Sequence, residues 1–115
     1  MPAYSDRVTM FGLVDKDTIK SALAKSSTYV LDVRAPEEID NSIDHANYRQ
    51  ATCTADGCPG LEGKDLAEIV PDKEAVLVIY CRSGKRAGKA KEMFEQAGYK
   101  NVLNAGGYDD ISDLV

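Results

Sequence analysis

The stretch that decides the fold is VLVIYCRSGKRAGKAKEMFEQAGY, residues Val76–Tyr99. It begins inside the most hydrophobic run in the chain, Ala75–Tyr80, which predicts a central strand covered on both faces. Apolar side chains then recur at helical spacing over Lys85–Ala97, and Gly98 stands where a glycine commonly ends a helix. The stretch therefore predicts a strand, a turn and a helix, with Cys81 at the turn.

The rest of the chain continues this alternation of strand-like and helix-like segments. The expected elements are a helix capped by Asp15, a strand over Thr28–Val33, short helices from Pro36 and over Asp65–Val70, a strand within Asn101–Tyr108, and a final helical turn within Asp109–Val115. Val8–Val14 is ambiguous, and the turn-rich segment Asn41–Gly63 predicts a long surface loop. Alternating strands and helices indicate an α/β fold, an open parallel sheet with helices on both faces.

Length and composition set the broad class. The 115 residues, 43% hydrophobic and 29% charged, fit one soluble globular domain over residues 1–115, with a monomer as the default expectation. The formal net charge of −5 argues against nucleic acid and anionic membranes as partners, because both favour a basic surface.

The N-terminus and the cysteines bear on the compartment. No apolar run approaches the roughly twenty residues of a membrane span, and MPAYSDRVTM lacks the basic and apolar regions of a secretory signal. Three cysteines, with Cys81 far in sequence from Cys53 and Cys58, fit a disulfide framework poorly. We therefore expect a cytoplasmic protein in a reducing compartment, and an organelle reached after processing stays open.

Cys81 is the strongest candidate for chemistry. It lies between a strand and a helix, where the first N–H groups of the helix lack intrahelical partners. Five of the fourteen Lys and Arg side chains follow it before the first acidic residue, Glu92, and these charges favour the thiolate. Gly84 allows a tight turn whose amides could converge on the sulfur, and Ser83 could donate a further hydrogen bond. A small buried apolar cysteine at a strand end is the alternative.

Two stretches of the chain resemble signatures of a known family. LDVRAPEEIDNSIDHANY (Leu31–Tyr48) resembles the N-terminal signature of the rhodanese family. YCRSGKRAGKAKEMFEQAGYKNVLNAGGYDD (Tyr80–Asp110) resembles its active-site loop, the following helix and a closing double-glycine segment. In place of the frequent motif Gly-His-Ile-x-Gly-Ala, residues Asn41–Ala46 keep only the Ile and the Ala, and Ile111 stands nearest to a common tryptophan position.

The resemblance implies a rhodanese-like fold and a thiosulfate sulfurtransferase. Cys81 would take the outer sulfur of thiosulfate or a related anionic donor, form a persulfide, and pass the sulfur to a thiol or cyanide; a protein could also serve as acceptor. The residues expected to bind substrate form the loop Arg82, Ser83, Gly84, Lys85 and Arg86. Its amides would hold the persulfide, Arg82 and Lys85 would attract the donor and stabilise departing sulfite, and Arg86 would brace the loop or share that work. No cofactor or metal is implied.

Two other functions stay open. Phosphatases and arsenate reductases of the same superfamily carry the loop Cys-x5-Arg, whereas Cys81 to Arg86 is Cys-x4-Arg, with Ala87 at the longer loop's arginine position. The shorter loop should be too tight to ring a tetrahedral phosphate with amides, but it can hold one sulfur atom. A persulfide carrier or partner-binding domain is the third possibility, because a carrier needs the same thiol as an enzyme.

Several further residues have weaker claims. Asp32 and Arg34 could support the pocket, with Arg34 meeting the anionic donor, or form a structural ion pair, which we favour. His45, the only histidine, could shuttle protons, although a solvated loop side chain is the better expectation. Cys53 and Cys58 are spaced poorly for zinc and are expected to be two free thiols in a flexible loop, with a regulatory disulfide as the minor alternative.

Overall fold

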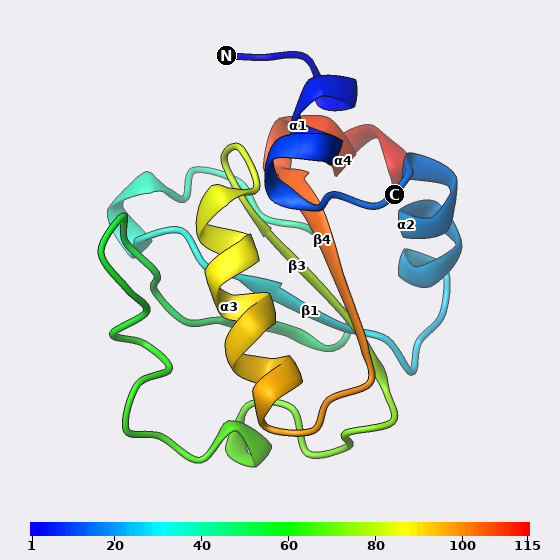
Figure 1. Cartoon of the computed structure of the whole chain (residues 1–115). Helices are drawn as coiled ribbons and strands as arrows, with labels where there is room; N and C mark the ends of the chain where they lie inside the picture. Colours follow the sequence, from blue (N-terminus) through cyan, green and yellow to red (C-terminus); the bar gives the residue numbers. More distant parts are fainter.

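Four parallel strands form one sheet in the computed structural model, which describes residues 1–115. The strands are β1 (Tyr29–Asp32), β2 (Tyr48–Gln50), β3 (Val76–Cys81) and β4 (Asn101–Gly107). They lie in the order β2-β1-β3-β4, and every neighbouring pair is parallel (Figure 1). This arrangement confirms the predicted open parallel sheet.

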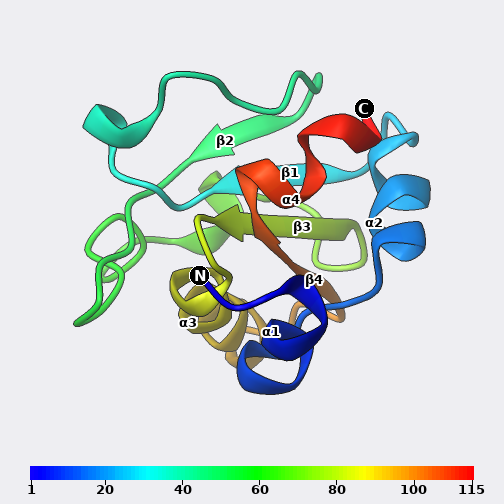
Figure 2. The same ribbon diagram turned by 90° about the horizontal axis from the view of Figure 1, so that it is seen from above.

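Helices cover both faces of the sheet, as predicted. The α-helices are α1 (Tyr4–Phe11), α2 (Lys16–Leu23), α3 (Lys85–Gln96) and α4 (Tyr108–Ile111), and the 3₁₀ turns are η1 (Pro36–Glu38), η2 (Leu66–Glu68) and η3 (Ser112–Leu114). In Figures 1 and 2, α3 lies on one face of the sheet, and α2 and α4 lie on the other. Asp15 caps α2 by accepting a hydrogen bond from the Thr18 amide.

Strand β3 contributes to two separate cores because its side chains alternate between the faces. Leu77, Ile79 and Cys81 belong to the cluster under α3, whereas Val78 and Tyr80 belong to the cluster under α2 and α4. All five are buried, which explains the continuous apolar run in the sequence. The alternation also fixes the face on which the Cys81 thiol lies.

One expectation for an irregular segment is corrected, and one ambiguous segment is resolved. The predicted surface loop Asn41–Gly63 contains β2, whose three residues pair with β1 in parallel. Tyr48–Gln50 is short, mostly polar and at the sheet edge, so no apolar alternation marked it. The ambiguous stretch Val8–Val14 divides into the end of α1 and a single bridge from Leu13 to Asn104 of β4.

The register of the sheet gathers the candidate residues at one edge. Asp32 at the end of β1 pairs with Tyr80 of β3, and Cys81 pairs with Gly107 at the end of β4. The carboxyl ends of parallel strands are the usual ligand-binding edge in open α/β sheets. No helix combines the length and apolar character that a membrane crossing requires.

Candidate active site

The turn after β3 holds the sulfur of Cys81 against a backbone amide. Gly84 donates its N–H to the Cys81 Sγ at 3.1 Å and is also the N-cap residue of α3. Its φ of +104° lies in the left-handed region, which glycine adopts without a steric cost. The predicted convergence on the sulfur is therefore present for one amide, that of Gly84.

Glycines also allow neighbouring segments to approach this turn closely. A Cβ added to Gly84 would lie 2.5 Å from Leu13 Cδ2. A Cβ on Gly107 would fall against the carbonyl oxygen of Arg82. The double-glycine segment at the end of β4 thus leaves the space that the turn occupies.

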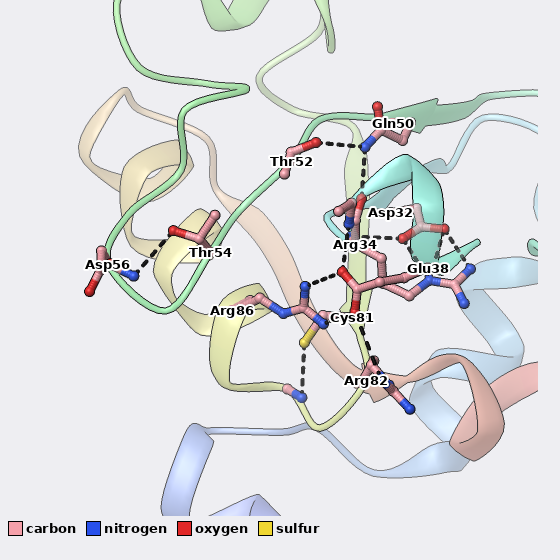
Figure 3. A network of polar contacts seen from close by, with 12 residues as sticks. Asp32, Arg34, Glu38, Gln50, Thr52, Thr54, Asp56, Cys81, Arg82 and Arg86 are labelled. Carbon is pink, nitrogen blue, oxygen red and sulfur yellow. Dashed lines mark hydrogen bonds and ion pairs between the residues drawn. The ribbon is translucent and has the colours of Figure 1, made fainter.

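The basic residues of the loop differ in their surroundings. Arg86 donates two hydrogen bonds to the Glu38 carboxylate, at 2.8 and 3.0 Å, and Figure 3 shows its guanidinium beside the Cys81 sulfur. The hydrogen bonds to Glu38 raise the pKa of Arg86 against the opposing effect of burial. The Arg82 side chain is 70% exposed, with its Nη1 4.0 Å from Glu38, and Lys85 is exposed. Arg86 therefore joins η1 to the loop, as the bracing interpretation requires.

Ser83 has a local contact rather than one with the sulfur. Its Oγ accepts a hydrogen bond from the Lys85 amide at 3.4 Å, as serine hydroxyls often do at the start of a helix. Its backbone carbonyl accepts a hydrogen bond from Arg7.

Asp32 and Arg34 form the buried ion pair that the sequence analysis favours. Arg34 Nη2 lies 2.7 Å from Asp32 Oδ2, and Arg34 Nε also donates to the same carboxylate. These hydrogen bonds hold the pKa of Arg34 above its usual value. The guanidinium lies over the rings of Tyr80 and Tyr108, at 5.4 and 5.1 Å. Both charges are thus fixed at the edge of the sheet where β1 and β3 end.

A cavity of about 510 Å³ opens over Cys81. Two guanidinium groups line it, those of Arg34 and Arg82. Four carboxylates line it as well: Glu37, Glu38, Asp40 and Asp109. The basic run after Cys81 predicts a positively charged site, but the chain folds acidic residues of η1 and α4 onto the same mouth.

Two buried polar residues that support the turn, Arg7 and Asn104, were not predicted from the sequence. Arg7 of α1 donates to the Ser83 carbonyl at 2.9 Å and forms a two-point ion pair with Asp110. Asn104 Nδ2 donates to the Gly84 carbonyl at 2.8 Å. Asn104 could have been predicted to have a buried hydrogen-bonding role, because it is a polar residue between apolar residues of a strand. The role of Arg7 could not be predicted, because the sequence around it has no clear helical or strand periodicity.

The other two cysteines correct an expectation. Cys53 and Cys58 form a disulfide, whereas the sequence favoured two free thiols in a flexible loop. The Thr54 amide donates to the Gly57 carbonyl and closes a turn that brings the cysteines together, and both are buried. The argument for a reducing compartment loses this support, and Cys81 is the one free cysteine.

His45 lies at the opposite end of the sheet from Cys81, in the loop before β2. Its Nδ1 accepts a hydrogen bond from the Asn47 amide, and its Nε2 lies 3.0 Å from the Lys25 carbonyl. Both ring nitrogens are therefore engaged locally, and the histidine is a half-buried loop residue rather than part of the site.

Comparison with known proteins identifies the family. The model of the rhodanese-like domain matches residues 15–114. The chain is 36% identical over 95 residues to thiosulfate sulfurtransferase PspE of Escherichia coli, covering 81% of this chain and 91% of that protein. Among solved structures, an E. coli rhodanese with anions has a TM-score of 0.60 and 30% identity, covering 74% of this chain and 92% of that one. The human single-domain sulfurtransferase TSTD1 has a TM-score of 0.65 and 25% identity, covering 85% and 92%. The chain belongs to the rhodanese-like sulfurtransferase family.

Proposed function

We propose that the protein is a thiosulfate sulfurtransferase in which Cys81 carries the sulfur as a persulfide. The observation that carries the proposal is the Gly84 amide at 3.1 Å from the Sγ of Cys81, a residue that lines the cavity and lies beside Arg86. An amide donor and a nearby guanidinium stabilise an anionic sulfur.

The reaction has two balanced steps. The Cys81 thiolate attacks the outer sulfur of thiosulfate, the S–S bond of the donor breaks, and sulfite leaves with the electron pair. The outer sulfur of the resulting persulfide is then attacked by cyanide or a thiolate, which restores the Cys81 thiolate. Dividing the transfer in this way is covalent catalysis.

Each residue around the thiol has a proposed role in these steps. The loop amides, beginning with that of Gly84, hold the terminal sulfur, and Ser83 orients the loop through its bond to the Lys85 amide. Arg82 and Lys85 meet the anionic donor and stabilise sulfite as it departs. Asp32 and Arg34 support the pocket wall, where Arg34 lines the cavity.

The alternatives are less well supported. Phosphatases and arsenate reductases of the superfamily use the longer Cys-x5-Arg loop to surround a tetrahedral anion with amides, whereas Cys81 to Arg86 spans six residues. A persulfide carrier would use the same thiol and would differ by lacking turnover with small acceptors.

Intact-mass spectrometry tests the proposal. Incubation with thiosulfate should add one sulfur atom to the protein, and cyanide should remove it as thiocyanate. Cys81→Ser should gain no sulfur, while Cys53→Ala/Cys58→Ala should gain it as the native chain does. An equal gain in Cys81→Ser would overturn the mechanism. A stable persulfide that cyanide and small thiols fail to discharge would favour the carrier.

A further inference from the structure

The first fourteen residues lie outside the family match, yet they contact the active-site turn. The matched region begins at residue 15, whereas α1 spans Tyr4–Phe11. Figures 1 and 2 show α1 at the end of the molecule where β3 leads into α3. Arg7, the buried residue of α1, has only 3% of its surface exposed.

Every nitrogen of the Arg7 guanidinium has a hydrogen-bond acceptor. Nε donates to the Pro2 carbonyl at 2.9 Å, and Nη2 donates to Asp110 at 2.7 Å. Nη1 donates both to Asp110 at 2.7 Å and to the Ser83 carbonyl at 2.9 Å. The guanidinium of this α1 residue therefore connects the segment before α1, α4 and the turn, and acceptors from all three hold it in place.

The Ser83 carbonyl that Arg7 holds belongs to the same peptide unit as the Gly84 N–H. That N–H donates to the Cys81 Sγ at 3.1 Å. Because a trans peptide is planar, its C=O and N–H point in opposite directions, so holding the oxygen also sets the direction of the N–H. A positive donor on the carbonyl polarises the peptide and strengthens its N–H as a donor.

A second side chain holds the adjoining peptide unit. Asn104, which is fully buried, donates through Nδ2 to the Gly84 carbonyl at 2.8 Å and to the Phe11 carbonyl at 3.1 Å. The side-chain amide of Asn104 thus bonds both the end of α1 and the turn. Together, Arg7 and Asn104 fix two successive peptide units of the turn from outside it.

We propose that Arg7 is a positioning residue for Cys81: through the Ser83–Gly84 peptide it aims an amide donor at the sulfur and stabilises its anionic form. The part of the proposal that concerns sulfur transfer rests on the proposed function. The effect on the thiolate does not, because it concerns the reactivity of Cys81 toward any electrophile.

The test measures alkylation of the full-length chain by iodoacetamide across pH. Cys81 is the free cysteine, so the rate reports on this thiol alone. Arg7→Met should lower the rate at neutral pH about tenfold and move its pH midpoint upward, because one pH unit is a tenfold change in thiolate. The rate of sulfur uptake from saturating thiosulfate should fall in parallel, with a smaller change in KM.

Three further variants separate positioning from stability. Arg7→Lys keeps a positive donor and should recover part of the rate. Asp110→Asn removes the counter-charge but leaves Arg7 its acceptors at Pro2 and Ser83, so it should lower the melting temperature without raising the alkylation midpoint. Arg49→Met is the matched control, because Arg49 donates to Tyr48 and lies over Tyr29, away from the turn.

The outcomes also distinguish this proposal from the proposed function. A native alkylation profile in Arg7→Met, or the same shift in Asp110→Asn, would overturn the positioning role, even if the native chain transfers sulfur. A shifted profile in a chain that takes up no sulfur from thiosulfate would support the positioning role and overturn the proposed function.

Discussion

The hydrogen bond to the Cys81 sulfur depends on one backbone conformation. Gly84 reaches the sulfur with φ at +104°, and Leu13 and Gly106 fill the space around its Cα. The sequence could predict Gly84, because a glycine after a cysteine at a strand end has a clear backbone purpose. It could not predict Arg7, because the contact joins residues 76 positions apart.

Gly84→Ala should reduce both stability and sulfur uptake. The left-handed conformation and the contact with Leu13 together should lower the free energy of unfolding by about 2 to 4 kcal/mol. The backbone movement that relieves the contact with Leu13 should draw the residue-84 amide away from the Cys81 sulfur. Persulfide formation should then slow at least tenfold. Gly63→Ala is the control, because Gly63 also has positive φ but nothing within 4 Å of an added Cβ. That variant should lose only about 1 kcal/mol and keep native uptake, measured by denaturation and mass spectrometry.

The pair between Glu38 and Arg86 should make stability depend on acid pH. Hydrogen bonds from Arg86 lower the pKa of Glu38 from 4.5 to about 2, against an opposing effect of burial. A carboxylate with a depressed pKa stabilises the fold fully above its unfolded pKa, and that contribution disappears as the pH falls through the folded value. Glu38→Gln should therefore cost about 1 to 2 kcal/mol at pH 7 and progressively less from pH 4.5 toward 2.

Urea denaturation at several pH values checks the Glu38 prediction. Glu74→Gln is the control, because Glu74 pairs with Lys100 where both side chains are about two-thirds exposed. Exposed pairs contribute below about 1 kcal/mol, so this variant should differ little from the native chain. A cost of Glu38→Gln that is the same at pH 7 and pH 3 would contradict the prediction.

At the scale of elements, the strongly patterned segments were predictable and the weakly patterned ones were not. β3 and α3 each carry a periodic apolar signal that their burial requires. β2 carries none, because an edge strand of three residues buries no side chain fully. The disulfide depends on a turn that its flanking residues do not specify, so spacing alone left its state open.

Reduction of the Cys53–Cys58 disulfide should destabilise the protein without removing its activity. Closing a loop with a sequence separation of five should contribute about 2 kcal/mol through restriction of the unfolded chain. The loop also rests on α3, where Lys89 Nζ donates to the Ala55 carbonyl at 2.6 Å. A phosphine reductant should lower the denaturation midpoint of the native chain, but not that of Cys53→Ala/Cys58→Ala. If Cys53→Ala/Cys58→Ala folds but takes up no sulfur, the disulfide supports the site and the prediction is wrong.

At the scale of the whole molecule, charge opposes the donor that the family chemistry uses. The net charge is −5, and four carboxylates share the cavity mouth with two guanidinium groups. Arg34 is already paired with Asp32, and Arg82 Nη1 lies 4.0 Å from the Glu38 carboxylate. The proposed donor, thiosulfate, would therefore meet a cavity in which acidic side chains outnumber the guanidinium groups, although the run that follows Cys81 in the sequence is basic.

Asp40→Asn/Asp109→Asn should increase kcat/KM for thiosulfate. A single carboxylate about 10 Å from a dianion repels it by somewhat less than 1 kcal/mol in water, so removing two should increase kcat/KM about two- to fivefold at low salt. Added salt should increase the native kcat/KM and reduce the difference between the two proteins, because screening weakens repulsion.

Asp17→Asn/Glu92→Gln is the control variant. It changes the net charge equally at positions that do not line the cavity, and should have little effect on kcat/KM. If this control variant gained as much as Asp40→Asn/Asp109→Asn, net charge rather than the cavity mouth would govern the approach of the donor. If instead neither variant changed kcat/KM and salt had no effect, the donor would reach Cys81 without passing the carboxylates.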